Sequence, residues 1–162
     1  MRFRRIWERN DEHIHVSVGS VFYAYTMGDT RPSNIDRTMA NLDAFVAESE
    51  GLVGFLFHVV AGAVPPSNHD RARTTEMFNK HAARLSGVAV VIEATGFPSA
   101  LLRSAVTMVF DMTRREFETR TFEDVVAASA WLAPKQAMTA SEIVTTGAEA
   151  RAALSEGRAP RW

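Results

Sequence analysis

Hydrophobic and polar residues near the start of the chain alternate with a period of two. In HIHVSV, residues 13–18, three aliphatic side chains alternate with His13, His15 and Ser17. This alternation predicts a β-strand with one buried face and one face in water, at or near the edge of a sheet. We therefore expect both histidines to lie on the wet face.

Two neighbouring runs extend this predicted sheet. VFYAYTM, residues 21–27, is separated from residues 13–18 by Gly19 and Ser20, and this spacing favours a β-hairpin. A weaker alternation from Phe3 to Trp7 predicts a short strand before the hairpin.

Strand-like and helical periodicities alternate along the rest of the chain, which favours parallel strand pairing. Residues 52–60 and 88–93 are apolar nearly throughout, as is typical of central parallel strands covered on both faces. Ser86 and Gly87 are interpreted as the stop of the second helix. The predicted helices span about 32–50, 68–85, 100–113 and 121–132, and a last short strand spans 116–120.

These elements predict an α/β domain over residues 1–134. We expect a mixed, mostly parallel sheet of about four to five strands with helices packed on it. Residues 135–162 are alanine-rich and predict a C-terminal helical extension, with Thr139 or Ser141 as the cap of a helix that runs through Leu154. Periodicity leaves open whether this extension packs back on the domain, docks on another subunit or is partly disordered.

Composition and charge narrow the classes of function. The chain has 162 residues, of which 46% are hydrophobic and 23% charged, values that are ordinary for one globular domain. Lysine and arginine total 18 against 19 for aspartate and glutamate, so the formal net charge is −1. Because no strong positive field attracts phosphates, we predict that the protein does not bind nucleic acid.

Cysteine content and targeting signals bear on the compartment. The chain contains no cysteine, which excludes disulfides, thiolate metal sites and cysteine nucleophiles. Residues 1–13 lack the apolar run of a signal peptide. The longest apolar stretches, 51–64 and 88–94, are shorter than the ~20 residues of a membrane span. We expect a cytoplasmic protein that does not insert into membranes.

The element order, with a hairpin leading into the first helix, resembles the STAS and SpoIIAA-like group, which includes bacterial anti-sigma-factor antagonists. TFEDVVAASAWLAP, residues 121–134, is similar to the last helix of many such domains. The resemblance covers about residues 12–133. It implies a signalling module that docks reversibly to a protein partner. In the antagonist branch, phosphorylation of a serine at the start of the helix after the central strand switches that docking.

Ser67 occupies the position comparable to that serine. The antagonists' Asp-x-Ser-Gly motif is absent, and residues 63–68 read AVPPSN instead. A phosphate on Ser67 would be stabilised by the helix N-terminus and by Arg71 or Arg73 one turn on. The simpler interpretation, which we favour, is that Ser67 caps the helix. Ser99, near the start of the next predicted helix, is a second candidate for modification or partner docking.

The sequence contains no recognisable catalytic or metal-binding spacing. Gly96 to Ala100 lacks the glycine that follows the serine in a nucleophile elbow, and no glycine spacing fits a phosphate loop. His13 and His15 offer two imidazoles on one strand face. A third ligand would have to come from His58, His69 or His81, or from a carboxylate such as Asp70. Because no metal spacing links these residues, we predict no catalytic residue, no metal and no cofactor, and we do not expect an enzyme.

The predicted helix 100–113 is apolar around most of its circumference. Leu101, Met108 and Met112 belong to a broad apolar surface that leaves only a narrow polar strip. Such a helix is either sandwiched between the sheet and a neighbouring helix or pressed against another molecule, and methionine adapts well to partners. These three residues are our candidates for an interface.

Two functions are consistent with these patterns. The first is a non-enzymatic interaction or regulatory module of bacterial signalling, which docks a partner protein or itself as a homo-oligomer through helices around the carboxyl ends of the strands. The alternative is a domain that binds a small apolar, lipid-like ligand between sheet and helices. A large cavity lined by Phe55, Phe57 and Met108 would favour the ligand, whereas tight packing and an exposed apolar helix would favour docking.

Overall fold

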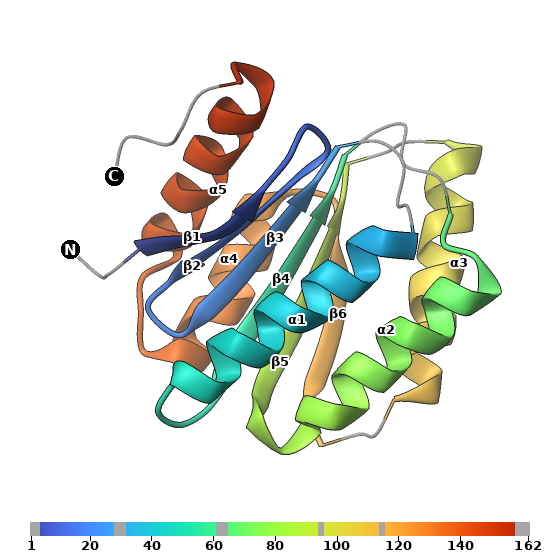
Figure 1. Ribbon diagram of the computed structural model, residues 1–162, viewed down its shortest axis with the longest axis horizontal. Helices are drawn as coiled ribbons and strands as arrows, with labels where there is room; N and C mark the ends of the chain where they lie inside the picture. Colours follow the sequence, from blue (N-terminus) through green and yellow to red (C-terminus); the bar gives the residue numbers. More distant parts are fainter. Residues whose placement is uncertain (1–3, 28–31, 61–64, 94–95, 114–115, 158–162) are drawn as a thin grey trace.

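The computed structural model describes residues 4–27, 32–60, 65–93, 96–113 and 116–157 (Figure 1). Six strands form one sheet: β1 (Arg4–Arg9), β2 (His13–Val18), β3 (Val21–Thr26), β4 (Val53–Val59), β5 (Leu85–Ile92) and β6 (Glu118–Phe122). The α-helices are α1 (Pro32–Glu48), α2 (Asn68–His81), α3 (Phe97–Met112), α4 (Val125–Leu132) and α5 (Ala140–Ser155). Short 3₁₀ turns, η1 (Ala82–Arg84) and η2 (Ala133–Gln136), follow α2 and α4.

The six strands lie side by side in chain order. β1, β2 and β3 pair antiparallel, and β3 to β6 pair parallel. The predicted class, a mixed and mostly parallel α/β sheet, is therefore confirmed. The sheet has one or two more strands than expected, because both terminal runs, now β1 and β6, pair as full edge strands.

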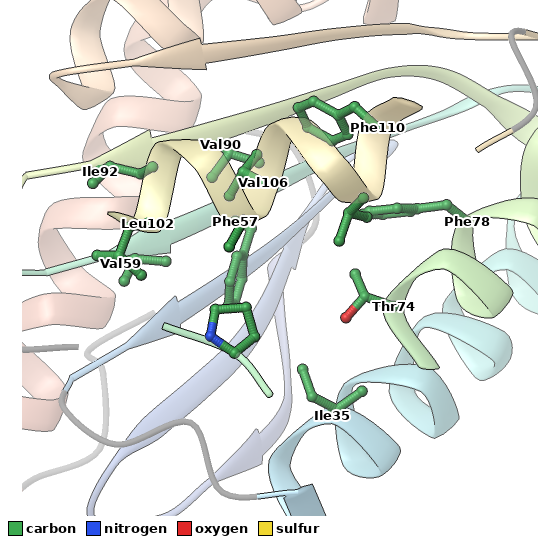
Figure 2. Close-up of a pocket in the computed structure, with 13 residues that line it drawn as sticks. Ile35, Phe57, Val59, Thr74, Phe78, Val90, Ile92, Leu102, Val106 and Phe110 are labelled. Atoms are coloured by element: carbon green, nitrogen blue, oxygen red, sulfur yellow. The ribbon is translucent and has the colours of Figure 1, made fainter. Parts of the chain in front are cut away.

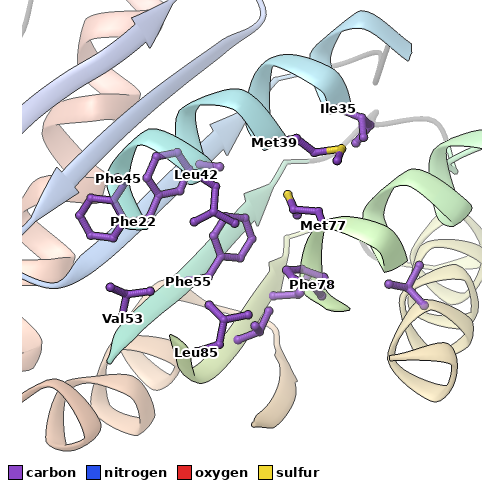
Figure 3. Close-up of a cluster of buried hydrophobic side chains, with 14 of the residues drawn as sticks. Phe22, Ile35, Met39, Leu42, Phe45, Val53, Phe55, Met77, Phe78 and Leu85 are labelled. Atoms are coloured by element: carbon purple, nitrogen blue, oxygen red, sulfur yellow. The ribbon is translucent and has the colours of Figure 1, made fainter. Parts of the chain in front are cut away.

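Helices cover both faces of the sheet. On the first face, α1, α2 and α3 lie over the parallel strands, as their place in right-handed strand–helix–strand crossovers requires (Figure 1). Phe22 and Phe55 of the sheet pack there against Phe45 of α1 and Phe78 of α2 (Figure 3). Since β3, β4 and β5 are buried from both sides, their sequences are apolar nearly throughout. No helix in the described part of the chain is long and apolar enough to span a bilayer.

The second face is covered by α4 and α5. Ile143 of α5 and Leu132 of α4 share one buried cluster with Tyr23 and Leu56 of the sheet, and α5 contacts β2, β3 and α4. Of the three alternatives left open for the C-terminal helix, the structure shows the first, in which the helix packs back on the sheet. The division of the chain at residue 134 stays a prediction.

One sequence interpretation is wrong: the histidine face of β2 is not in water. His13 and His15 are both fully buried, because α1 crosses over this face. Thr38 of α1 lies 3.2 Å from His15 Nε2, and the side-chain amide of Asn41 lies 2.9 Å from His15 Nδ1. Alternation of polar and apolar residues therefore marks two different buried faces here, one apolar and one polar.

The expected stop at Ser86 and Gly87 is also wrong. α2 ends at His81, and Ser86 and Gly87 lie inside β5. A Cβ atom on Gly87 would lie 3.1 Å from Trp131 of α4, so glycine is used there to let α4 approach the sheet closely. Glycine ends a helix or strand where the backbone needs a conformation that other residues avoid. Inside a strand, as at Gly87, it can instead make room for a neighbouring helix.

We predict that Gly147→Ala destabilises the protein. A Cβ at Gly147 of α5 would lie 2.5 Å from the Tyr23 hydroxyl, which is buried and hydrogen-bonded. Overpacking of this kind costs about 1–3 kcal/mol, more than the gain in helix propensity from alanine. Urea unfolding measures the change, with the exposed Ala148→Ser as control. An increase in stability for Gly147→Ala would show that α5 does not pack on β3 as described.

Candidate functional site

A small apolar pocket lies between the sheet and the helices of the first face. Phe57 and Val59 of β4 and Ile92 of β5 form its floor, and Val106 of α3 and Phe110 of α3 form one wall (Figure 2). The remaining lining residues are Ile35, Pro66, Thr74, Phe78, Val90, Leu102, Ala105 and Val109. Thr74 is the one polar side chain among them. The pocket therefore offers an apolar environment with almost no hydrogen bonding.

The pocket is small for a lipid. Its volume is about 70 Å³, whereas a cavity that holds benzene in a protein core measures roughly 150 Å³. Phe57 lines the pocket as expected, but Phe55 and Met108 do not, and Met108 is about half exposed. By the criterion set from the sequence, this packing favours docking over ligand binding.

The outer side of α3 carries an exposed apolar stripe. Leu101, Met108 and Met112 have exposed fractions of 43%, 47% and 59%. They follow each other at i, i+7 and i+11, which places them on one side of the helix. Leu102 and Val109, on the inner side, are buried. α3 thus packs on the sheet by one side and presents a second apolar side to solvent, and we call Leu101, Met108 and Met112 the α3 stripe.

Ser67 is the N-cap of α2. Its hydroxyl accepts the backbone N–H of Asp70 at 3.1 Å, and its own backbone N–H donates to Asp70 Oδ2 at 3.2 Å, which completes a capping box. The Ser67 hydroxyl also donates to Asp70 Oδ2 at 2.8 Å. Arg71 donates to the Pro66 carbonyl, next to Ser67. Arg73 instead pairs with Asp36 and Glu76. The capping interpretation therefore has direct structural support, and phosphorylation of Ser67 stays a prediction.

Ser99 lies in the first turn of α3 and is buried. Its hydroxyl accepts a hydrogen bond from Arg103 Nε at 3.2 Å. A modifying enzyme or a docked partner reaches only exposed hydroxyls, so the present conformation does not present Ser99 for either role.

His58 of β4 belongs to a buried hydrogen-bonded chain on the second face of the sheet. The Tyr23 hydroxyl lies 2.5 Å from His58 Nδ1, and His58 Nε2 lies 2.7 Å from the Glu93 carboxylate. Arg151 of α5 donates to the same carboxylate oxygen at 3.1 Å. Burial lowers the pKa of His58, against the opposing effect of Glu93, and raises the pKa of Tyr23.

This series of hydrogen bonds links α5 to the sheet and does not form an open reaction centre. Tyr23 is fully buried, with Gly147 of α5 directly against its hydroxyl, so no substrate can approach it. His58 is thus a buried ring whose two nitrogens both have hydrogen-bond partners.

Sequence reasoning missed the partners of these histidines. Tyr23 and His58 lie on neighbouring parallel strands with side chains on the same face, but strand order was needed to bring them together. Glu8 of β1 similarly lies 3.2 Å from His13 Nε2. The acidic neighbour of His13 and His15 is thus Glu8, a carboxylate as the sequence allowed, but not Asp70, the example named from the sequence.

Comparisons with known proteins agree with this fold. The structure resembles the crystal structure of an uncharacterized protein from the DUF3478 family, described as having a SpoIIAA-like fold, from Shewanella loihica PV-4. The alignment has a TM-score of 0.50 and 19% sequence identity, and it covers 82% of this chain and 95% of the other. No protein-family model and no curated protein matches the sequence. The chain therefore has a SpoIIAA-like fold, as its sequence indicated.

We predict that His58 makes the protein less stable in acid. Burial holds the pKa of His58 in the folded state below the ~6.5 of an unfolded chain. As the pH falls below about 6.5, the unfolded chain takes up a proton that the folded chain resists, so the free energy of unfolding decreases. His58→Gln removes this contribution, and its urea midpoint should fall less than that of the wild type between about pH 7 and pH 5.

The exposed His69→Gln on α2 is the matched control and should keep the wild-type pH dependence. Equal pH dependence in wild type and His58→Gln would contradict the role given to this ring. The neighbouring Tyr25, Glu93 and Arg151 are kept in all three proteins, so the comparison isolates the His58 ring together with its interactions with Glu93 and Arg151.

Proposed function

We propose that this chain is a non-enzymatic interaction module of bacterial signalling that associates with a second copy of itself through the α3 stripe. The observation that carries the proposal is the exposure of Leu101, Met108 and Met112 on a helix whose other side is already packed. Burying such side chains in an interface releases about 25 cal/mol for each Å² of apolar surface. Methionine also adapts its shape to a partner at low cost.

The choice of a second copy as partner rests on charge. The formal net charge of −1 gives two identical chains little mutual repulsion. The neighbouring edge strand β6 does not compete for this role, because Glu118 and Arg120 are exposed there, and charges of both signs discourage edge-to-edge strand pairing. Helix packing through α3 is therefore the better route to association.

Ser67 is a candidate regulatory position in this proposal. A phosphate there would lie beside the buried Asp70 carboxylate that now accepts the Ser67 hydroxyl. Since like charges repel and the capping box would be lost, phosphorylation would loosen the start of α2. This effect is the opposite of the stabilisation by Arg71 and Arg73 that the sequence suggested, and Arg73 is held by other carboxylates.

We expect the purified protein to form a concentration-dependent dimer that Met108→Asp converts to a monomer. An aspartate in the middle of the α3 stripe would bury an unpaired charge in the interface. Thr107→Asp adds the same charge at the neighbouring exposed position outside the stripe and should leave the dimer intact. Light scattering over a range of protein concentrations gives the mass. A wild-type monomer at every concentration would refute self-association.

A second candidate function, the binding of a small apolar ligand, is favoured by the pocket. The pocket is nearly devoid of polar groups and lies near the carboxyl ends of the parallel strands, where ligands bind in open α/β sheets. A bound molecule of more than a few heavy atoms would require the helices to move apart, since the volume is about 70 Å³.

We expect benzene, used as a probe, to raise the unfolding temperature if the pocket opens, because a ligand that binds only the folded state stabilises it. Ala105→Leu fills the pocket and should abolish this rise. Ala100→Leu, an exposed change on the same helix, is the control. No rise in the wild type, or an equal rise in both variants, would eliminate the pocket as a ligand site.

A further inference from the structure

Three metal-ligating side chains converge beneath α1, at a site separate from the α3 stripe and the apolar pocket. Glu8 of β1 and His13 and His15 of β2 each offer a ligand atom, and these atoms all lie within 4.8 Å of one another. Both imidazoles are fully buried, and the Glu8 carboxylate is partly exposed. The three groups are thus close enough together to surround a single ion.

A β-bulge in β1 brings Glu8 to this face. Ile6 pairs with Val16, but Glu8 and not Trp7 pairs with His15, so one extra residue is accommodated between them. In a regular strand Glu8 would point to the side opposite Trp7 and the histidines. Bulges redirect side chains, and they are common next to functional sites. The bulge is a second observation, independent of the histidine spacing.

The chemistry of the three groups suits a divalent cation. A carboxylate oxygen and imidazole nitrogens are both common ligands of such ions. The ring nitrogens are now held by hydrogen bonds within the protein, to Glu8 for His13 and to Thr38 and Asn41 for His15, and a bound ion would replace some of these contacts.

Positively polarised groups already point into this cluster. The Asn41 amide nitrogen lies 2.8 Å from Glu8 Oε2 and 2.9 Å from His15 Nδ1. Arg37 donates to Glu8 Oε1 at 2.6 Å, and its own side chain is more than half exposed. An exposed ion pair is worth at most about 1 kcal/mol, so Arg37 can turn to solvent at low cost. Rotation of the Asn41 amide would present its oxygen in place of its nitrogen.

We propose that Glu8, His13 and His15 bind a divalent transition-metal ion of the Zn²⁺ type. Two imidazoles and one carboxylate are a ligand set that zinc accepts, with a fourth position for water or for the Asn41 oxygen. The ion would join β1, β2 and α1, the part of the fold farthest along the sheet from β6.

The test is titration of Zn²⁺ into the full, untagged chain after treatment with a chelator, followed by calorimetry. We expect about one ion per chain and a higher unfolding temperature, since the ion binds the folded state. His13→Gln and His15→Gln should each weaken Zn²⁺ binding by more than roughly tenfold. A loss of that size already follows when a residue that only hydrogen-bonds to a metal ligand is mutated. His69→Gln removes an exposed histidine and should leave the affinity unchanged.

Glu8→Gln keeps the size of Glu8 and one of its two acceptor oxygens while removing its charge, so it tests the carboxylate even if the histidine variants fold poorly. In the wild type, ¹⁵N resonances of the His13 and His15 rings should shift on addition of Zn²⁺, whereas that of His69 should not. Absence of stoichiometric binding, or binding that shifts the His69 ring and not the other two, would overturn the proposal.

Discussion

The fold depends on a sheet that is buried on both faces. β2, β3, β4 and β5 lie between two layers of helices, so nearly every side chain on them is buried, and each buried polar group there needs a partner within the protein. His58 meets this requirement through Tyr23 and Glu93, and His15 through Thr38 and Asn41. The buried histidines therefore fix how α1 and α5 sit on the sheet.

Most helices and strands could be predicted from the sequence, because their apolar residues follow the period of the element that buries them. The runs that became β4 and β5 were apolar nearly throughout, and α5 carried its N-cap at Thr139. The sequence did not predict what covers each face of a strand. A polar face of β2 looks the same in sequence whether water or α1 covers it, and Gly87 looks like a stop although it serves close packing against Trp131.

The candidate sites could be predicted only in part, for a related reason. Ser67 as a cap and the α3 stripe depend on spacing within one helix, which the sequence carries directly. The grouping of Glu8 with His13 depends on strand pairing and on a bulge that reverses the expected orientation of one residue. Local pattern contains neither, so the sequence does not show which side chains of different strands meet.

The position of α5 has a consequence for synthesis of the protein. Arg4 at the start of β1 pairs with Glu149 of α5, a separation of 145 positions along the chain. While the ribosome is still making the second half, Val16 and Tyr23 of the hairpin lack the helix that will cover them. A nascent chain in this state exposes an apolar strand surface, the kind of surface that chaperones bind and that promotes aggregation. Release of residues 140–155 is therefore the step that protects the N-terminal half.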